Sequence, residues 1–157
     1  MHPNVVRVTD AARAAGLEIS VQRFPEGTRT AAEAAFAVGC EVAQIIKSLV
    51  FIADEAPILA LVSGANRVDL AKLADVLGSA TARRANGDEA RAATGYAIGG
   101  VPPFGHARPI TVVVDRDLLV HDRLWAAAGL PDAVFSISPD DLRRISAGTV
   151  ADLASTP

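Results

Sequence analysis

Ile45-Ile46-Lys47-Ser48-Leu49-Val50-Phe51-Ile52-Ala53 is the stretch that decides the fold, because it is the most apolar run of the chain. It predicts a buried strand, and residues 58–62 predict a second one. Between them, Asp54-Glu55-Ala56-Pro57 is typical of a tight turn. We therefore expect the two strands to form a hairpin.

Helices and strands are intermixed along the rest of the chain. Capping residues and helical spacing predict helices at residues 5–15 with Asn4 as the cap, 30–39, 69–78, 86–95, 124–128 and from Ser138-Pro139 onward. Alternating or continuous apolar residues predict strands at 17–21, 110–114 and 134–137. Because there is no regular β-α-β order, the pattern favours a mixed α+β domain over a doubly wound parallel sheet.

The length and composition fit one domain spanning residues 1–157. With 50% apolar residues, 21% charged residues and a net charge of −3, the chain is not disordered, a coiled coil or a basic nucleic-acid clamp. The single cysteine, Cys40, excludes an internal disulfide framework. A signal-peptide pattern is missing at the N-terminus, and Lys47 interrupts the best candidate for a membrane span. We therefore expect a soluble, cytoplasmic protein with no membrane partner.

Lys47 is the first residue that the rules for a buried strand do not explain. The chain has two lysines against thirteen arginines, and this one interrupts the most apolar strand. A buried ammonium costs stability unless it reaches water or finds a partner. One interpretation is that Lys47 simply reaches solvent near the start of the strand. The other is that it points into a pocket and binds a phosphate, carboxylate or carbonyl oxygen.

Gly99-Gly100-Val101-Pro102-Pro103-Phe104-Gly105 is the second such feature. Two glycines leave the backbone free at the start of this loop, and two prolines fix φ in its middle. Such a loop can hold backbone N–H groups toward an oxygen atom, as an oxyanion site requires. An ordinary wide turn is the alternative interpretation. The spacings of a Walker loop and of a Rossmann fingerprint are both absent.

Conventional catalytic motifs are missing from the sequence. HExxH, CxxC and GxSxG do not occur, and the three histidines lie far apart along the chain. Cys40 follows a glycine and is typical of a small core residue rather than a nucleophile. We therefore expect no metal and no cofactor. If the chain is an enzyme, catalysis rests on positioning and on backbone electrostatics.

Together the two features resemble a known family, the YbaK and prolyl-tRNA synthetase-associated domains. Residues 44–51 are similar to the family's lysine-bearing strand. Residues 94–106 are similar to its glycine–proline loop, where Gly99 to Pro103 match a GxxxP pattern. The motifs also have the family's order and separation, and weaker likeness extends over nearly the whole chain.

The resemblance implies an α+β fold in which a mixed, β-barrel-like sheet is surrounded by helices. It also implies trans-editing, the hydrolysis of the ester between a wrong small amino acid and the 3′-terminal adenosine of a tRNA, often the tRNA for proline. The implied partners are a mischarged tRNA and, beyond it, an aminoacyl-tRNA synthetase. Lys47 would then help to seat the terminal nucleotide and the ester, while the amides of Gly99 and Gly100 face the ester carbonyl. A ribose hydroxyl of the substrate would assist the attacking water.

One departure limits the resemblance. Val101-Pro102-Pro103 stands where the cysteinyl-tRNA deacylases carry Cys-Ser-Pro, so the amino-acid specificity does not carry over. The further substrate-binding candidates are Thr30, Ser63, Asn66, Val101, Pro103, Phe104, His106 and Asp115. Contacts with tRNA phosphates are a further role for Arg83, Arg84, His106 and Arg108. The polar candidates can instead be cap, turn or surface residues.

Two other classes of function stay open on the sequence alone. One is a non-catalytic module that binds a nucleotide or an aminoacyl analogue in the same pocket. The other is a hydrolase of a small ester without an RNA partner. The acidic net charge favours both, since tRNA binding usually needs clustered positive charge.

Overall fold

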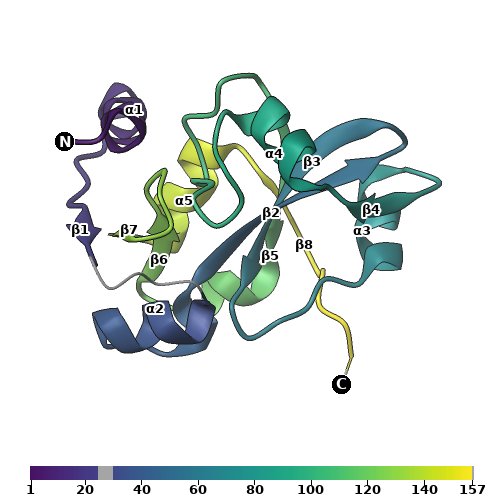
Figure 1. The fold of residues 1–157 in the computed structure, drawn as a ribbon. Helices are drawn as coiled ribbons and strands as arrows, with labels where there is room; N and C mark the ends of the chain where they lie inside the picture. The colour runs from purple at the N-terminus through teal and green to yellow at the C-terminus, as the bar shows by residue number, and fades with distance from the viewer. Residues whose placement is uncertain (25–29, 157) are drawn as a thin grey trace.

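The computed structural model describes residues 1–24 and 30–156, and its strands form two sheets surrounded by helices (Figure 1). The larger sheet has five strands in the order β4-β2-β3-β5-β8, and the smaller has three in the order β1-β7-β6. The mixed α+β class is therefore confirmed. The barrel-like sheet needs a correction, because the described strands form two open sheets rather than a closed barrel.

The central hairpin of the larger sheet consists of β2 (Ile46–Ala53) and β3 (Ala56–Ser63), as the two apolar runs predicted. The strands are antiparallel and stay in register along their whole length. Asp54 and Glu55 form the turn with φ of 46° and 71°. Positive φ at both positions matches the twist of the flanking strands, which is why a two-residue turn suffices.

Three short strands extend this hairpin on both sides. β4 (Ala82–Arg84) pairs antiparallel with β2, whereas β5 (Thr111–Asp115) pairs parallel with β3. β8 (Thr149–Ala151) pairs parallel with β5 at the other edge. Since parallel neighbours need long crossovers, the sheet brings together segments that are distant in the sequence.

The smaller sheet lies against the start of β2. In it, β7 (Ala133–Ile137) pairs antiparallel with both β1 (Gln22–Arg23) and β6 (Leu124–Ala127). An isolated parallel bridge between Ile45 and Trp125 links the two sheets. The junction of the sheets is thus at the strand that carries Lys47.

The helices begin and end largely where capping residues predicted. Side chains of Thr30, Asp69, Asn86 and Ser138 accept hydrogen bonds from first-turn amides, which would otherwise lack partners. The helical elements are α1 (Pro3–Ala14), α2 (Ala31–Val38), α3 (Leu70–Leu77), α4 (Gly87–Thr94), α5 (Pro139–Ser146) and the 3₁₀ turns η1 (Val42–Gln44) and η2 (Arg116–Val120). Among the described residues, no helix combines the length and apolarity needed to cross a bilayer.

Three sequence predictions about local structure are wrong. The helix predicted at 124–128 is the strand β6, in which Leu124 and Ala126 are buried and Trp125 and Ala127 are partly exposed. Pairing with β7 overrides the helical propensity of alanine. The strand predicted at 17–21 has the expected alternating burial but no ladder partner, and only Gln22–Arg23 pair. His2, not Asn4, caps α1, because the Asn4 side chain instead donates to the Gly129 carbonyl at 3.0 Å.

The core has two main parts, one on each face of the larger sheet. The larger part lies between the two sheets and α1, and it includes Val50, Phe104 and Phe135. The smaller part lies on the α3 side of the hairpin and includes Phe51 and Leu73. Successive residues of β2 therefore contribute to different parts of the core.

Candidate functional site

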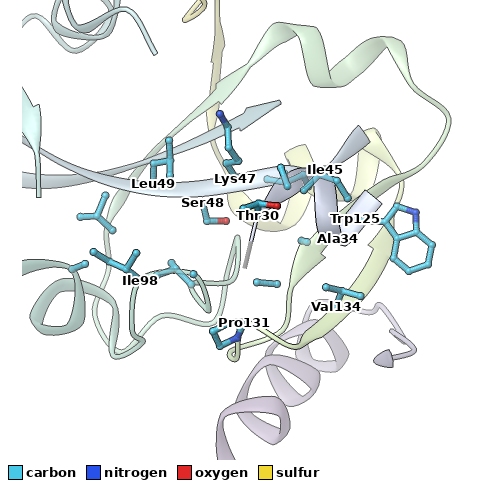
Figure 2. Close-up of a pocket in the computed structure, with 18 of the residues that line it drawn as sticks. Thr30, Ala34, Ile45, Lys47, Ser48, Leu49, Ile98, Trp125, Pro131 and Val134 are labelled. Atoms are coloured by element: carbon cyan, nitrogen blue, oxygen red, sulfur yellow. The ribbon is translucent and has the colours of Figure 1, made fainter. Parts of the chain in front are cut away.

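A cavity of about 310 Å³ lies where β2, α2, β6 and residues 98–101 meet (Figure 2). Most of its lining side chains are apolar. The polar side chains of the lining belong to Thr30, Lys47, Ser48 and Arg84. Of the residues predicted for the site, the cavity lining includes Thr30, Lys47, Gly99 and Val101.

Lys47 and Ser48 point to opposite sides of β2. Figure 2 shows the Lys47 ammonium on one side of the strand and the Ser48 hydroxyl on the other, toward Ile98 and Pro131. This follows from the strand period of two, which also separates Val50 from Phe51 into the two parts of the core. The site therefore has a polar face around the Lys47 ammonium and an apolar face at the cavity.

The Lys47 ammonium is half-buried and donates a hydrogen bond to the backbone carbonyl of Asn66. Burial lowers its pKa below the usual 10.5, and the positive charges of Arg84 and Arg67 lower it further. Asp115 acts in the opposite direction. Three cationic side chains thus lie near one another although the chain as a whole is acidic.

Ser63, Asn66 and Asp115 come together next to Lys47, on its side of β2. The Asp115 carboxylate has no exposed surface and accepts from the Ser63 amide at 3.1 Å and from the Asn66 side chain at 2.9 Å. Its other oxygen accepts from the Asp117 amide at 3.0 Å. The Ser63 hydroxyl in turn donates to the Ala43 carbonyl at 2.8 Å. These three predicted residues do not line the cavity; they fix the carbonyl that holds Lys47.

Gly99 and Gly100 differ in their surroundings. Gly99 has a φ of 90°, is exposed and lines the cavity opposite Pro131. Gly100 is buried outside the lining, and its amide donates to the Ala97 carbonyl at 3.0 Å. A Cβ at Gly100 would lie 2.9 Å from the Gly129 carbonyl oxygen. Gly100 is therefore a close-packing position behind the loop, whereas Gly99 faces the cavity.

The second half of the loop lies away from the cavity. Phe104 is buried against Phe135, with ring centroids 5.7 Å apart. A ring nitrogen of His106 is 2.7 Å from the Pro102 carbonyl, and burial lowers the pKa of this histidine. Together with Pro103 they border a separate, more open hollow. In this structure Pro103, Phe104 and His106 hold the loop in shape and do not contact the cavity.

Arg83 and Arg84, two of the arginines predicted to contact phosphates, also differ in whether they line the cavity. Arg83 forms a two-pronged ion pair with Glu89, at 2.9 and 2.7 Å, which lowers the Glu89 pKa to about 2. Arg84 instead stacks over the Phe51 ring and lines the cavity. Arg84 thus presents its charge at the site, whereas the charge of Arg83 is neutralised by its partner.

Ser48, Trp125 and Pro131 are lining residues that sequence reasoning missed. The alternation within residues 45–53 could have placed Ser48 on the face opposite Lys47. Trp125 and Pro131 carry no motif and reach the cavity only through the pairing of β6 with β7. Among the described residues, no group of three or more histidine, cysteine, aspartate or glutamate side chains is arranged as a metal site.

Comparisons with known proteins give a consistent picture. Residues 25–145 match the family model described as an aminoacyl-tRNA editing domain. The proline–tRNA ligase of Xanthomonas oryzae pv. oryzae is 37% identical over 108 residues, which are 69% of this chain and 19% of the ligase. That of Streptococcus pyogenes is 29% identical, covering 91% of this chain and 27% of the ligase. The chain thus spans about a fifth to a quarter of the curated relatives it matches.

A solved structure extends the likeness to the whole fold. It is described as a candidate trans-editing enzyme for prolyl-tRNA synthetase, and it superposes with a TM-score of 0.94 at 44% sequence identity. The superposition covers 99% of both chains. At this identity the likeness extends to the sequence as well as to the backbone.

Proposed function

The chain belongs to the aminoacyl-tRNA editing domain family, and we propose that it is a trans-editing deacylase. It hydrolyses the ester that joins a wrong, small amino acid to the 3′-terminal adenosine of a tRNA. The observation that carries this proposal is the small apolar cavity with cationic groups beside it. The tRNA for proline is the proposed substrate, because the similar ligases and the similar structure are named for proline.

The size and lining of the cavity support a small acyl group. Ligand pockets in proteins range over about 300–1,000 Å³, and a cavity of about 310 Å³ is at the lower end. Its apolar walls favour a short side chain, since burying apolar surface stabilises the complex in proportion to area.

The charges near the cavity support a nucleic-acid substrate. The net charge of −3 would weakly repel phosphate, but Lys47, Arg67 and Arg84 form a local positive cluster. Phosphate contacts of this kind supply most of the sequence-independent affinity for nucleic acids. The cluster supports tRNA binding by supplying local positive charge, although the acidic net charge of the chain favoured the other two classes of function.

We propose that positioning, rather than a side-chain base, accounts for catalysis. Among the described residues, the cavity lining holds no histidine, cysteine, aspartate or glutamate that could serve as a general base. Lys47 would seat the terminal nucleotide from the polar face of β2, and the Gly99 backbone would face the carbonyl oxygen of the ester. Water attacks, assisted by a ribose hydroxyl of the substrate, and neither a metal nor Cys40 takes part.

A panel of mischarged tRNAs tests the proposal. Alanyl-, seryl- and cysteinyl-tRNA for proline are incubated with the protein, and the loss of ester is followed under single-turnover conditions, with prolyl-tRNA as the cognate control. We expect hydrolysis of at least one small mischarged ester, preserved in the presence of a chelator and in Cys40→Ser. Binding of these tRNAs without hydrolysis would favour the binding module. Hydrolysis of free amino-acid esters alone would favour the small-ester hydrolase. We propose that the protein acts in the cytoplasm, on tRNA mischarged by a prolyl-tRNA synthetase.

A further inference from the structure

Ser48 is the polar group of the cavity that the proposed mechanism does not use. Its hydroxyl oxygen is buried and forms no hydrogen bond with the described residues. The other polar groups of the lining have partners: the Thr30 hydroxyl caps α2, the Lys47 ammonium donates to Asn66, and Arg84 stacks on Phe51. A buried hydroxyl without a partner costs stability, because it loses its hydrogen bonds to water and gains none in return. A serine at this position therefore destabilises the empty protein relative to alanine.

The position of Ser48 shows where a partner would have to be. Its neighbours on the same face of β2 are Ile46 and Val50, both buried in the core. The hydroxyl points from β2 toward Ile98 and Pro131, into the cavity (Figure 2). A group bound in the cavity is thus positioned to hydrogen-bond with it.

The charges around the cavity indicate which group of the substrate would hydrogen-bond with Ser48. Every aminoacyl ester carries an α-ammonium, but a buried cation needs a negative or strongly accepting partner. The described lining has no carboxylate, and Lys47 and Arg84 add positive charge. A neutral hydroxyl needs only one partner that can both donate and accept, which a serine hydroxyl is.

We propose that Ser48 is a specificity-determining residue that hydrogen-bonds the side-chain hydroxyl of a seryl group held in the cavity. This inference rests on the proposed function and names the acyl group within it. An alanyl group has the size to enter but leaves the Ser48 hydroxyl unpaired. Sites built to bond a substrate hydroxyl discriminate strongly against the analogue that lacks it, because their own polar group is then left without a partner.

The test compares seryl and alanyl esters on the same tRNA. We expect the wild-type protein to have a kcat/KM for the seryl ester at least about tenfold above that for the alanyl ester. Ser48→Ala should reduce this seryl-to-alanyl ratio by about tenfold, and Ser48→Thr, which retains a hydroxyl, should retain the preference. A fall of both rates by one common factor in Ser48→Ala would overturn the proposal, because it would place the hydroxyl on a group shared by both esters.

A melting curve supplies a second readout and a matched control. Thr9 carries another buried hydroxyl without a hydrogen bond, and it lies on α1 outside the cavity lining. Ser48→Ala and Thr9→Val should each raise the melting temperature of the free protein by about 2 °C or more. Only the change at Ser48 should alter the seryl-to-alanyl ratio. A lower melting temperature in Ser48→Ala would overturn the proposal, since the hydroxyl would then serve the fold.

The outcomes separate this inference from the proposed function. If the wild-type protein hydrolyses neither ester, nor any other ester of the panel, the deacylase proposal fails. If it hydrolyses both at similar rates, and Ser48→Ala leaves their ratio unchanged, only the role of Ser48 is wrong.

Discussion

The two sides of β2 are held together by different forces. On the Lys47 side, a buried carboxylate, an amide side chain and an ammonium are linked by hydrogen bonds through Asp115 and Asn66. On the Ser48 side, apolar side chains and a closely packed glycine loop form the cavity. The comparison shows that adjacent residues of one strand can contribute to a rigid polar support and to a binding surface. Substitutions on the two sides should therefore differ in how much they affect stability and how much they affect activity.

The largest expected effect is the loss of the Asp115 carboxylate. Asp115→Ala leaves the Ser63 amide and the Asn66 side chain without their buried acceptor. We expect it to lower the free energy of unfolding by about 3 kcal/mol, because each orphaned donor loses its compensation. Denaturant unfolding measures this. Asp117→Ala is the control: its exposed carboxylate also accepts from Asn66, at 2.8 Å, and should cost less than about 1 kcal/mol. If both substitutions lower the free energy of unfolding equally, the burial of the Asp115 carboxylate does not add to its contribution.

Removing the Lys47 ammonium should affect activity more than stability. Lys47→Ala removes a positioned charge and little core volume, so we expect deacylation to fall by roughly 10²-fold or more with a normal melting curve. Lys72→Ala is matched to it, since Lys72 is the only other lysine and pairs with Asp152 away from the cavity. Full activity in Lys47→Ala would remove this lysine from the proposed site.

Alanine substitutions at the two adjacent glycines should differ in their effects, one mainly on stability and the other also on turnover. Of the two, Gly99 has the positive φ and Gly100 does not. At Gly100 a methyl group meets the Gly129 backbone, and we expect a loss of about 1–3 kcal/mol in stability from overpacking. Gly99→Ala should cost about 1–2 kcal/mol through its φ and should reduce turnover, because it faces the cavity. Unfolding curves and single-turnover rates are measured on both variants. If Gly100→Ala mainly reduces turnover and Gly99→Ala only lowers stability, the roles of the two glycines are the reverse of those assigned here.

A smaller effect is expected at the cap of α2, which borders the cavity. The Thr30 hydroxyl accepts from the Glu33 amide at 3.1 Å. Thr30→Ala should cost about 1 kcal/mol, whereas Thr30→Ser should retain most of the stability, because serine supplies the same acceptor. Thermal or denaturant unfolding compares the three proteins. If Thr30→Ser is as unstable as Thr30→Ala, Thr30 does not stabilise the protein by capping α2.

The finest test is the titration of Lys47. Its pKa lies below 10.5 in the folded protein, so at pH values between that lowered pKa and 10.5 the unfolded chain binds more protons. The free energy of unfolding should therefore rise with pH in this window, and Lys47→Met should flatten the rise. With only two lysines, selective ¹³C labelling gives a direct titration. Arg84→Met should move the pKa of Lys47 upward. An unchanged pKa would show that Arg84 does not belong to the cationic cluster.

Local signals predicted much of the architecture. The hairpin follows from two apolar runs around Asp54 and Glu55, and helix ends follow from caps such as Thr30 and Asn86. The strand β6 could not be predicted in this way, because its alanines favour a helix until β7 supplies a partner. Very short strands such as β4 and β8 are likewise defined by their neighbours rather than by their own sequence.

The candidate site was predicted in part for the same reason. Lys47 and Gly99 stand out as local violations of strand and loop rules, and both line the cavity. The separation of Ser63, Asn66 and Asp115 from the cavity depends on which face of β2 each approaches, and motifs do not encode this. Ser48 looks unremarkable in the sequence and becomes notable only when its lack of a hydrogen-bond partner is known.

The hairpin also determines the order in which the cavity is assembled. β2 and β3 are joined by a two-residue turn, and such hairpins form in about 1–10 μs. The opposite wall depends on β6, β7 and residues 98–101, whose contacts with β2 span much longer stretches of chain and form more slowly. We therefore expect the strand that carries Lys47 and Ser48 to form early in folding, before the loop packs against it. Brief local openings of the native protein are therefore expected to start from the loop, with the lysine-bearing wall as the last part to come apart.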